Sequence, residues 1–355
     1  MIATQLSLRH FRTYEDLVLP LAPGLCTFVG GNAQGKTNLI EAVYLCCVGR
    51  SHRTSSDSDM VSHGAGQAMV EMQIAAGNLN HIVRMDLPAS GRKKVSIDGA
   101  PVRRLGELFG VATCVLFSPD QMSLVKDGPE VRRRFLDVAL CQAQPVYFHH
   151  LTQYNRALQQ RNALLRDQPN CLDATLEAWD EKLAQSGAAI VARRAAFVAQ
   201  LDGLAADLHG GIAEGERLQV RYRPHTEAAD AESMQAAIRR RHQVDRARGT
   251  STVGPHRDEL EVTLAGHLAR AFCSQGQQRT AALSLILAQL CAMQQLTGEW
   301  PILLLDDVLS ELDDARRTAL LGLLPQVQTL VTGTNIPDLP DSRWQVTTGK
   351  VMVIS

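Results

Sequence analysis

The segment GGNAQGKT at residues 30–37 has the spacing of a phosphate-binding loop, G-x-x-x-x-G-K-[ST]. It follows an apolar run at 25–29, which predicts a strand, and it precedes a run with apolar residues on one side, which predicts a helix. Such a loop surrounds phosphate oxygens with backbone N–H groups at a positive helix N-terminus. The alternative interpretation is a plain glycine turn. The residues predicted to bind a nucleoside triphosphate, ATP, are Gly30, Gly31, Asn32, Ala33, Gln34, Gly35, Lys36 and Thr37.

Two side chains of this loop have predicted roles of their own, and a second motif supplies acids. Lys36 is expected to reach the β and γ phosphates, and the Thr37 hydroxyl to ligate Mg²⁺. The apolar run ILLLDD at 302–307 predicts a buried strand that ends in two carboxylates. We predict Asp306 as the second Mg²⁺ ligand and Asp307 as the group that orients or deprotonates the attacking water. Since apolar strands often end in an acid, this assignment depends on the phosphate loop.

A third motif, FCSQGQQRT at 272–280, places Ser274 and Gly276 immediately before an apolar helical pattern. One interpretation is a serine that caps the helix. The other is an anion site at the helix N-terminus. Because the chain's own phosphates would already be held by residues 30–37, that anion would belong to a second subunit.

Taken together, SQGQ at 274–277, the phosphate loop, ILLLDD and SELD at 310–313 resemble the head of an ABC-type ATPase. Within that superfamily the chain is most similar to the RecF family of bacterial recombination mediators. The similarity continues through RSHRT at 50–54, FSPD at 117–120, RRRFLD at 132–137 and VGPHRDEL at 253–260. It covers essentially the whole chain.

The resemblance implies an ATP-dependent homodimer that encloses two ATP molecules. In that dimer Ser274, Gly276 and Gln277 would face the γ phosphate bound by the partner, and catalysis would depend on Lys36, Asp307 and Ser274. Hydrolysis would be slow and would act as a switch.

The resemblance also implies roles for positions at which this chain is less typical. Asp313 would lie in a loop that passes signals across the dimer, and a glutamine-bearing loop would map near residues 118–121. Thr332 or Thr334 would stand where many ABC ATPases have a switch histidine. The chain has no histidine there, and its second acid is Asp307 rather than a glutamate.

The function implied by the resemblance is a cytoplasmic, ATP-dependent DNA-binding recombination mediator in DNA repair and replication. It would act on double-stranded, junction or gapped DNA together with RecR and RecO-type mediators, with no membrane partner. Two other classes stay open: the ATPase subunit of a membrane transporter and a P-loop kinase of small molecules. Membrane cofractionation would favour the first, and a phosphorylated acceptor would favour the second.

The composition places any nucleic-acid surface locally, because the formal net charge is only −1 with 21% charged residues. Three stretches are basic, at 92–104, at 132–134 and at 239–249, and each either contacts phosphates or forms ordinary solvated or ion-paired surface. No aromatic residues interleave them, which disfavours stacking on single-stranded bases. The cluster GPHRD at 254–258 is read either as a buried ion-pair network or as a catalytic group.

The predicted fold class is α/β: an ABC-type P-loop ATPase head, with a mixed sheet and antiparallel strands, and an inserted helical domain. Residues 1–125 and 249–355 are expected to form the head, and residues 126–248 the insertion. Apolar positions at three-and-four spacing predict two helices over about 151–165 and 176–208, paired as a short antiparallel hairpin. A two-residue turn at Asp98-Gly99 predicts a β-hairpin. No run of about 18 apolar residues occurs, and the eight cysteines contain no C-x-x-C pair.

Overall fold

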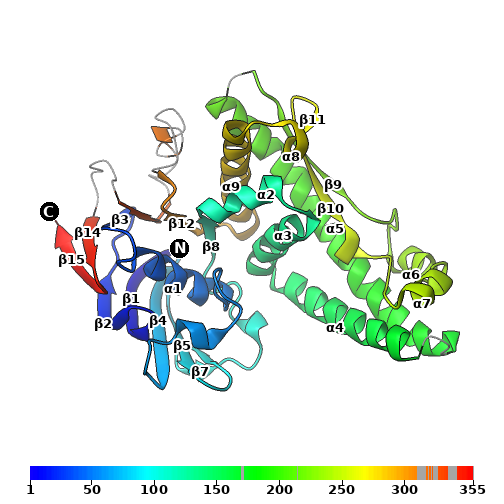
Figure 1. The fold of residues 1–355 in the computed structure, drawn as a ribbon, viewed down its shortest axis with the longest axis horizontal. Helices are drawn as coiled ribbons and strands as arrows, with labels where there is room; N and C mark the ends of the chain where they lie inside the picture. The colour runs from blue at the N-terminus through cyan, green and yellow to red at the C-terminus, as the bar shows by residue number, and fades with distance from the viewer. Residues whose placement is uncertain are drawn as a thin grey trace. The chain divides into compact units, whose positions relative to one another are not determined.

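The computed structural model divides the chain into two compact units. It describes residues 1–355 except 169–171, 214, 310–316, 319, 321, 323–326, 335–341 and 355. The first unit comprises Met1–Met122, Gly211–Glu214 and Ala282–Ser355, and the second comprises Ser123–Gly210 and Gly215–Ala281. Figure 1 shows strands from both ends of the chain, in blue and in red, within the first unit.

The second unit reaches further along the chain than the expected insertion at 126–248. Strand β10 (Glu259–Leu264) pairs antiparallel with β9 (Leu218–Arg223), so the segment after residue 248 joins the helical unit through a sheet. Periodicity along one segment cannot reveal such a long-range pairing. The assignment of head and insertion to these parts by function stays a prediction.

The N-terminal half of the first unit forms the predicted antiparallel sheet. Most of its alternating apolar residues, such as Leu6, Val70 and Met85, are buried, which is the pattern of a sheet with one face on the core, whereas Leu79, the first residue of its strand, is exposed. At Asp98 and Gly99 φ is 53° and 80°, as a two-residue hairpin turn of this kind requires, and the predicted hairpin is confirmed. The strands, in sheet order, are β2 (Tyr14–Pro20), β1 (Ile2–Phe11), β4 (Gln67–Ala76), β5 (Leu79–Pro88), β6 (Lys94–Ile97) and β7 (Ala100–Pro101).

A second sheet in the same unit is parallel except at one edge. The predicted strands at 25–29 and 302–307 are confirmed as inner members of this sheet, and the strand Thr329–Gly333 lies between them. Helix α1 (Lys36–Val48) contacts strands of both sheets, so all of its residues except Thr37 are buried. In sheet order the strands are β15 (Lys350–Ile354), β14 (Ser342–Thr347), β3 (Leu25–Val29), β13 (Thr329–Gly333), β12 (Ile302–Asp306) and β8 (Cys114–Phe117).

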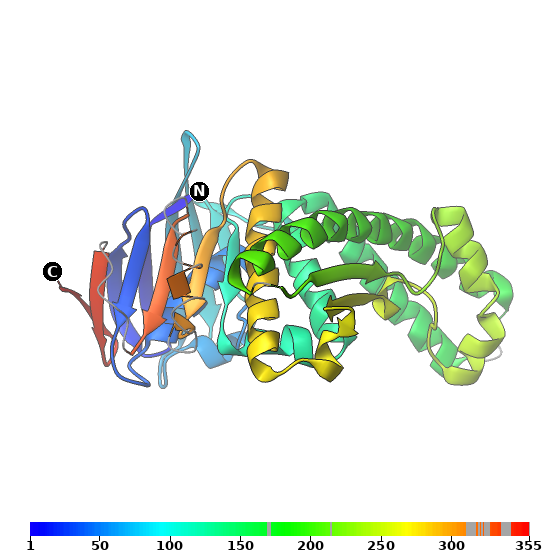
Figure 2. The same cartoon turned by 90° about the horizontal axis from the view of Figure 1, so that it is seen from above.

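The second unit is mainly helical, and Figures 1 and 2 show its two longest helices side by side. Besides β9 and β10 its sheet contains β11 (His267–Leu268). Helix α9 (Gln275–Thr297) begins in this unit and continues into the first. The other helices are α2 (Ser123–Lys126), α3 (Pro129–Ala143), α4 (Pro145–Asp167), α5 (Asp173–Ile212), α6 (Ala231–Arg239), α7 (His242–Arg248) and α8 (Ala269–Phe272). Short 3-10 helices occupy Asp57–Met60, Leu105–Glu107, Pro119–Met122 and Pro255–Arg257.

Helices α4 and α5 form the predicted antiparallel hairpin, with polar contacts along their seam. Tyr147 accepts a hydrogen bond from Arg194 (3.0 Å), and Arg161 donates one to Asp180 (2.7 Å). Between these two contacts, Gly187 packs against the ring of Tyr154. From one contact to the next the residue number rises by seven in α4 and falls by seven in α5, as an antiparallel pair requires. Gly187 and Arg194 are not apolar core residues of the usual kind, yet both are in close contact across this seam.

The described part of the chain contains seven free cysteines, five of them buried. One described helix, α9, is long and apolar enough to cross a membrane, and 72% of its apolar window is buried inside the protein. Core helices of soluble proteins share that property, so the helix is weak evidence for a membrane span.

Replacing Arg161 with leucine tests the buried part of the seam. Arg161 is fully buried between the carboxylates of Asp180 and Asp245, each 2.7 Å away. We expect Arg161→Leu to lower the free energy of unfolding by about 3–5 kcal/mol, because two buried carboxylates lose their shared counter-charge. Urea denaturation followed by far-UV circular dichroism measures this loss.

The control is Arg239→Leu, which removes an arginine whose pair with Glu177 is exposed on both sides. Its cost is expected to stay below about 1 kcal/mol. Equal small losses in both variants would show that the buried network does not stabilise the unit.

Candidate nucleotide-binding site

The predicted phosphate loop lies between the central strand β3 and the buried helix α1. Position 30 has room only for glycine, since a Cβ there would lie 2.3 Å from the carbonyl oxygen of Val346 in the neighbouring strand β14. Gly35 caps α1 with φ 109°, a conformation that glycine adopts without strain. The sheet and the helix therefore fix both ends of the loop.

The Lys36 ammonium is directed onto the loop at the start of α1. It donates hydrogen bonds to the carbonyl oxygens of Gly30 (2.8 Å) and Gly31 (2.7 Å). Burial lowers the pKa of Lys36, while the charges of Asp307 and Asp306 oppose that shift. The structure thus places one cation within the field of both strand-end acids.

The other predicted site residues of the first unit meet at the end of β12. Asp306 Oδ1 accepts hydrogen bonds from the hydroxyls of Thr37 (2.9 Å) and Thr332 (2.6 Å). Neighbouring ligands of an octahedral ion with bonds of 2.0–2.1 Å are about 2.9 Å apart, so the Thr37 and Asp306 oxygens suit Mg²⁺ in chemistry and spacing. Of the two threonines considered for the switch position, Thr332 joins this group, whereas Thr334 is exposed.

Asp307 turns away from the strand at the same point. Its backbone has φ 53°, a left-handed conformation that is uncommon for a residue with a side chain. Its N–H donates to the carbonyl (3.1 Å) and hydroxyl (3.0 Å) oxygens of Thr332, which hold the turn in place. Strained backbone of this kind is characteristic of functional sites.

Two contacts that brace the phosphate loop come from distant segments. Gln34 Oε1 accepts hydrogen bonds from the N–H (2.6 Å) and the hydroxyl (3.0 Å) of Thr348, in the turn between β14 and β15. The Tyr14 hydroxyl donates to the carbonyl of Gly35 (3.1 Å). Sequence reasoning missed both supports, because neither residue belongs to a motif.

A buried carboxylate on α1 forms a further anchor. Glu41 is fully buried, and it accepts hydrogen bonds from Arg12 at 2.9 and 2.7 Å and from Ser51 at 2.5 Å. Burial opposes the ionisation of Glu41, but these bonds and the charges of Arg12 and Arg53 outweigh it and hold the pKa below its usual range. Arg12 and the RSHRT segment are therefore tied to the helix that carries the loop.

The third motif lies in the second unit and forms a capping box at the start of α9. The Ser274 hydroxyl accepts from the N–H of Gln277 (3.3 Å), and the Gln277 side chain accepts from the N–H of Ser274 (2.9 Å). Gln277 also donates to Glu216 (2.7 Å). The cap interpretation therefore holds, and a role for Ser274, Gly276 and Gln277 at a partner's phosphate stays a prediction.

Other predicted residues have mixed outcomes. Residues 118–121 follow β8, and their assignment as a glutamine-bearing loop stays a prediction. Asp313 lies outside the described residues.

In the basic stretch at 132–134, Arg132 forms a two-bond pair with Glu259 (2.8 and 2.9 Å), and Arg133 donates to the carbonyl of Asp258 (2.8 Å). The ion-paired interpretation thus applies to Arg132, whereas Arg133 is bound to a backbone carbonyl.

GPHRD forms a buried network in the second unit. Asp258 is 1% exposed and accepts hydrogen bonds from Arg194 (3.3 Å) and from the backbone N–H of His225 (2.8 Å). The Tyr154 hydroxyl lies 2.5 Å from His256 Nδ1, and the opposite ring nitrogen faces the carbonyl of Ser251 (3.1 Å). The structural interpretation therefore accounts for this motif, except for Arg257, whose side chain is exposed.

Comparison with known proteins identifies the family. The model of the RecF/RecN/SMC N terminal domain matches residues 2–335. A protein of Lachnoclostridium phytofermentans named DNA replication and repair protein RecF is 42% identical over 348 residues, 97% of this chain and 95% of that protein. The chain belongs to the RecF family. A RecF protein of Alkaliphilus oremlandii is 38% identical over 96% of this RecF-family chain and 95% of its own length.

Solved structures agree with this assignment. The recombination mediator protein RecF-ATPrS in the RecFOR pathway superposes on this RecF-family chain with a TM-score of 0.93, at 31% identity, over 100% of this chain and 98% of that one. An Smc head domain of Pyrococcus furiosus matches with a TM-score of 0.59 at 17% identity, over 99% and 95%, which shows a shared fold. The predicted fold class, an ABC-type head with an inserted helical part, is confirmed.

Two adjacent glycines of the loop give a matched test of its geometry. We expect Gly30→Ala to lower the affinity for an ATP analogue more than tenfold, because the new methyl group collides with the carbonyl of Val346 and must displace the loop. Gly31→Ala is the control, since its Cβ meets only the Gln34 side chain, at 3.7 Å. Equilibrium binding of a fluorescent ATP analogue measures both. Similar losses in both variants would contradict the role given to the strand contact.

Proposed function

We propose that this RecF-family chain is an ATP-dependent DNA-binding recombination mediator in DNA repair and replication. The observation that carries the proposal is the group at the end of β12, where Asp306 accepts hydrogen bonds from Thr37 and Thr332 beside the ammonium of Lys36. The relatives named DNA replication and repair protein RecF and the solved RecF-ATP structure support it.

In the proposed site the loop residues Gly30 to Thr37 hold the triphosphate of ATP. Lys36 exchanges its bonds with the loop carbonyls for bonds to the β and γ phosphates, and Thr37 and Asp306 hold Mg²⁺. The metal ion supplies charge neutralisation on the phosphate oxygens. Asp307 orients the attacking water and accepts its proton as the water oxygen bonds to the γ phosphorus. The bond from that phosphorus to the bridging oxygen breaks, and ADP leaves with the bridging oxygen.

The proposed site is completed by a second copy of the chain. The capped N-terminus of α9, with Ser274, Gly276 and Gln277, would meet the γ phosphate bound by the partner, because a helix N-terminus favours an anion. ATP would then stabilise the dimer only to the extent that it binds the closed form better. Slow hydrolysis would set how long the dimer stays closed.

The proposed partners are double-stranded, junction or gapped DNA together with RecR and RecO-type mediators, and the proposed location is the cytoplasm. The RecFOR context of the solved relatives supports the protein partners. Local basic surface in the second unit supports the DNA partner, since the net charge of −1 provides no bulk attraction.

A pair of variants tests the composite site. We expect Lys36→Ala to abolish ATP binding, because the triphosphate loses its principal cation. Asp307→Asn should keep ATP binding but lose hydrolysis, and with saturating ATP and Mg²⁺ it should elute as a dimer in size-exclusion chromatography. A wild-type and Asp307→Asn chain that both stay monomeric under those conditions would contradict the proposal.

DNA binding is tested with three substrates at one salt concentration. We expect ATP and Mg²⁺ to increase the affinity for gapped and duplex DNA, with single-stranded DNA bound more weakly, because the basic stretches lack interleaved aromatic residues for stacking. Fluorescence anisotropy measures all three, and Lys36→Ala is the control that should lose the ATP effect. Equal affinity with and without ATP would contradict the switch mechanism. Phosphorylation of a small-molecule acceptor by ATP would instead favour a kinase.

A further inference from the structure

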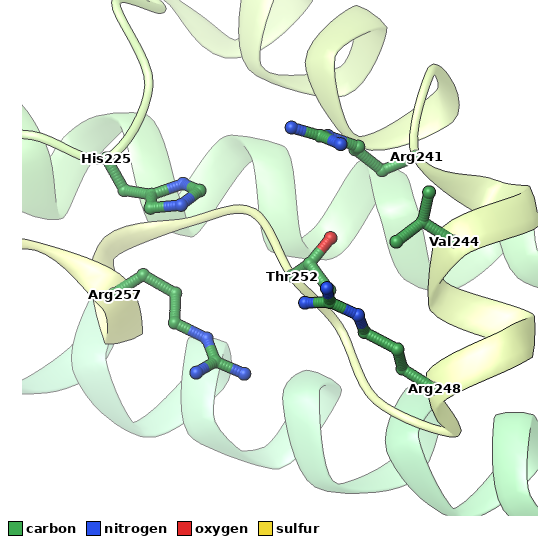
Figure 3. Close-up of a pocket in the computed structure, with 6 residues that line it drawn as sticks. All are labelled: His225, Arg241, Val244, Arg248, Thr252 and Arg257. Atoms are coloured by element: carbon green, nitrogen blue, oxygen red, sulfur yellow. The ribbon is translucent and has the colours of Figure 1, made fainter.

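The second unit contains a basic pocket that the nucleotide site does not use. We call it the arginine pocket; it has a volume of about 220 Å³. Figure 3 shows three guanidinium groups and an imidazole directed toward the same space. The lining residues are His225, Arg241, Val244, Arg248, Thr252 and Arg257, and none of them is acidic.

The lining residues come from separate segments that a buried network holds together. Arg241 caps α7, which carries Arg248, whereas Arg257 ends the 3-10 helix Pro255–Arg257. The intervening segment is fixed because Thr252 donates two hydrogen bonds to the buried carboxylate of Asp245, at 3.0 and 2.6 Å. The pocket is therefore part of the folded unit rather than a chance meeting of flexible side chains.

The positive charge of the pocket is not neutralised by nearby acids. The carboxylate of Asp245 is bound to Arg161, and that of Asp258 to Arg194, Tyr222 and the His225 backbone. Both acids are 1% exposed. Over the described ranges of the chain, no carboxylate lies within ion-pair distance of Arg241, Arg248 or Arg257.

Two other exposed arginines of the same unit do have carboxylate partners. Arg223 pairs with Glu261 (2.9 Å), and Arg239 pairs with Glu177 (3.5 Å). The field inside the pocket also reaches its neighbour His256. Burial lowers the pKa of His256 to about 4, and the charges of Arg257, Arg133 and His225 act in the same direction. Converging cations without acids favour an anionic ligand.

We propose that the arginine pocket binds one phosphate of a duplex DNA backbone. Planar guanidinium groups match the geometry of phosphate oxygens. No tyrosine, tryptophan or phenylalanine lines the pocket, so it offers no platform for a base, and a backbone contact positions the duplex without reading its sequence. The inference rests on the proposed DNA binding and assigns one of its contacts.

The test compares two double variants that remove the same formal charge. In Arg241→Gln/Arg248→Gln both changes are in the pocket, whereas in Arg223→Gln/Arg239→Gln both arginines are paired elsewhere. Duplex binding is measured with ATP and Mg²⁺ over a series of salt concentrations. We expect the pocket variant to lower the slope of log affinity against log salt by about 1, the loss of one phosphate contact, and to do so equally for unrelated sequences. The control should leave the slope within error of the wild type.

A second pair of variants keeps every arginine. Val244→Glu places a carboxylate among the guanidinium groups and should lower the slope by about the same amount, whereas Val244→Ala should not. Binding of a fluorescent ATP analogue and the far-UV circular dichroism spectrum should be unchanged in all variants, which excludes misfolding as the cause.

The outcomes separate this inference from the proposed function. If the wild type binds duplex DNA but both double variants change the slope equally, the pocket is not a phosphate site and the proposed function stands. If the wild type with ATP does not bind duplex DNA, both fail. Inorganic phosphate could stabilise the wild type against heat, and only the pocket variant could lose this effect while its duplex binding is unchanged. That result would assign a small anion to the pocket and contradict the proposal that it binds a DNA phosphate. If the pocket variant instead loses binding of a partner protein while its duplex binding is unchanged, the pocket binds that protein and the proposal is wrong.

Discussion

Helix α1 is buried on every side, and this constraint determines how the phosphate loop is built. A helix enclosed by two sheets cannot leave a polar group without a partner, because an unpaired buried charge costs several kcal/mol. Glu41 accordingly binds Arg12 and Ser51, which lie on segments that flank the helix. These bonds fix the direction in which α1 begins, and the strand β3 fixes where the loop leaves the sheet. The loop therefore has little freedom at either end.

The end of β12 shows how one strand provides two acids with different surroundings. Asp306 stays in the strand, where two threonine hydroxyls donate to it. Asp307 enters the left-handed region at φ 53°, and strain of this kind costs roughly 1–3 kcal/mol. The turn separates the two carboxylates, and bonds from the Asp307 N–H to Thr332 hold it. The acid proposed to hold the metal ion and the acid proposed to orient the water are in this way neighbouring residues with different surroundings.

The parts that the sequence predicted are those with local signals. The phosphate loop, the strand end at Asp306 and the Asp98-Gly99 turn each depend on residues within a short window. The bond from Thr348 to Gln34 could not be predicted, because the two residues are more than 300 positions apart. The inclusion of residues after 248 in the second unit could not be predicted for the same reason, since it depends on the pairing of β9 with β10. Long-range pairing leaves no periodic trace in either segment.

The basic stretches show why charge in a sequence does not define a surface. Arg132 belongs to a basic run, yet it is 3% exposed and pairs with Glu259. Arg239 and Arg241 are two positions apart, yet only Arg239 has a carboxylate partner in the described structure. Helix geometry and tertiary pairing decide which cations remain available to a ligand. In the buried network Asp245 and Asp258 are already bound to Arg161 and Arg194, so they are not available to the arginines of the pocket. Packing within the second unit therefore creates the positive pocket at its surface.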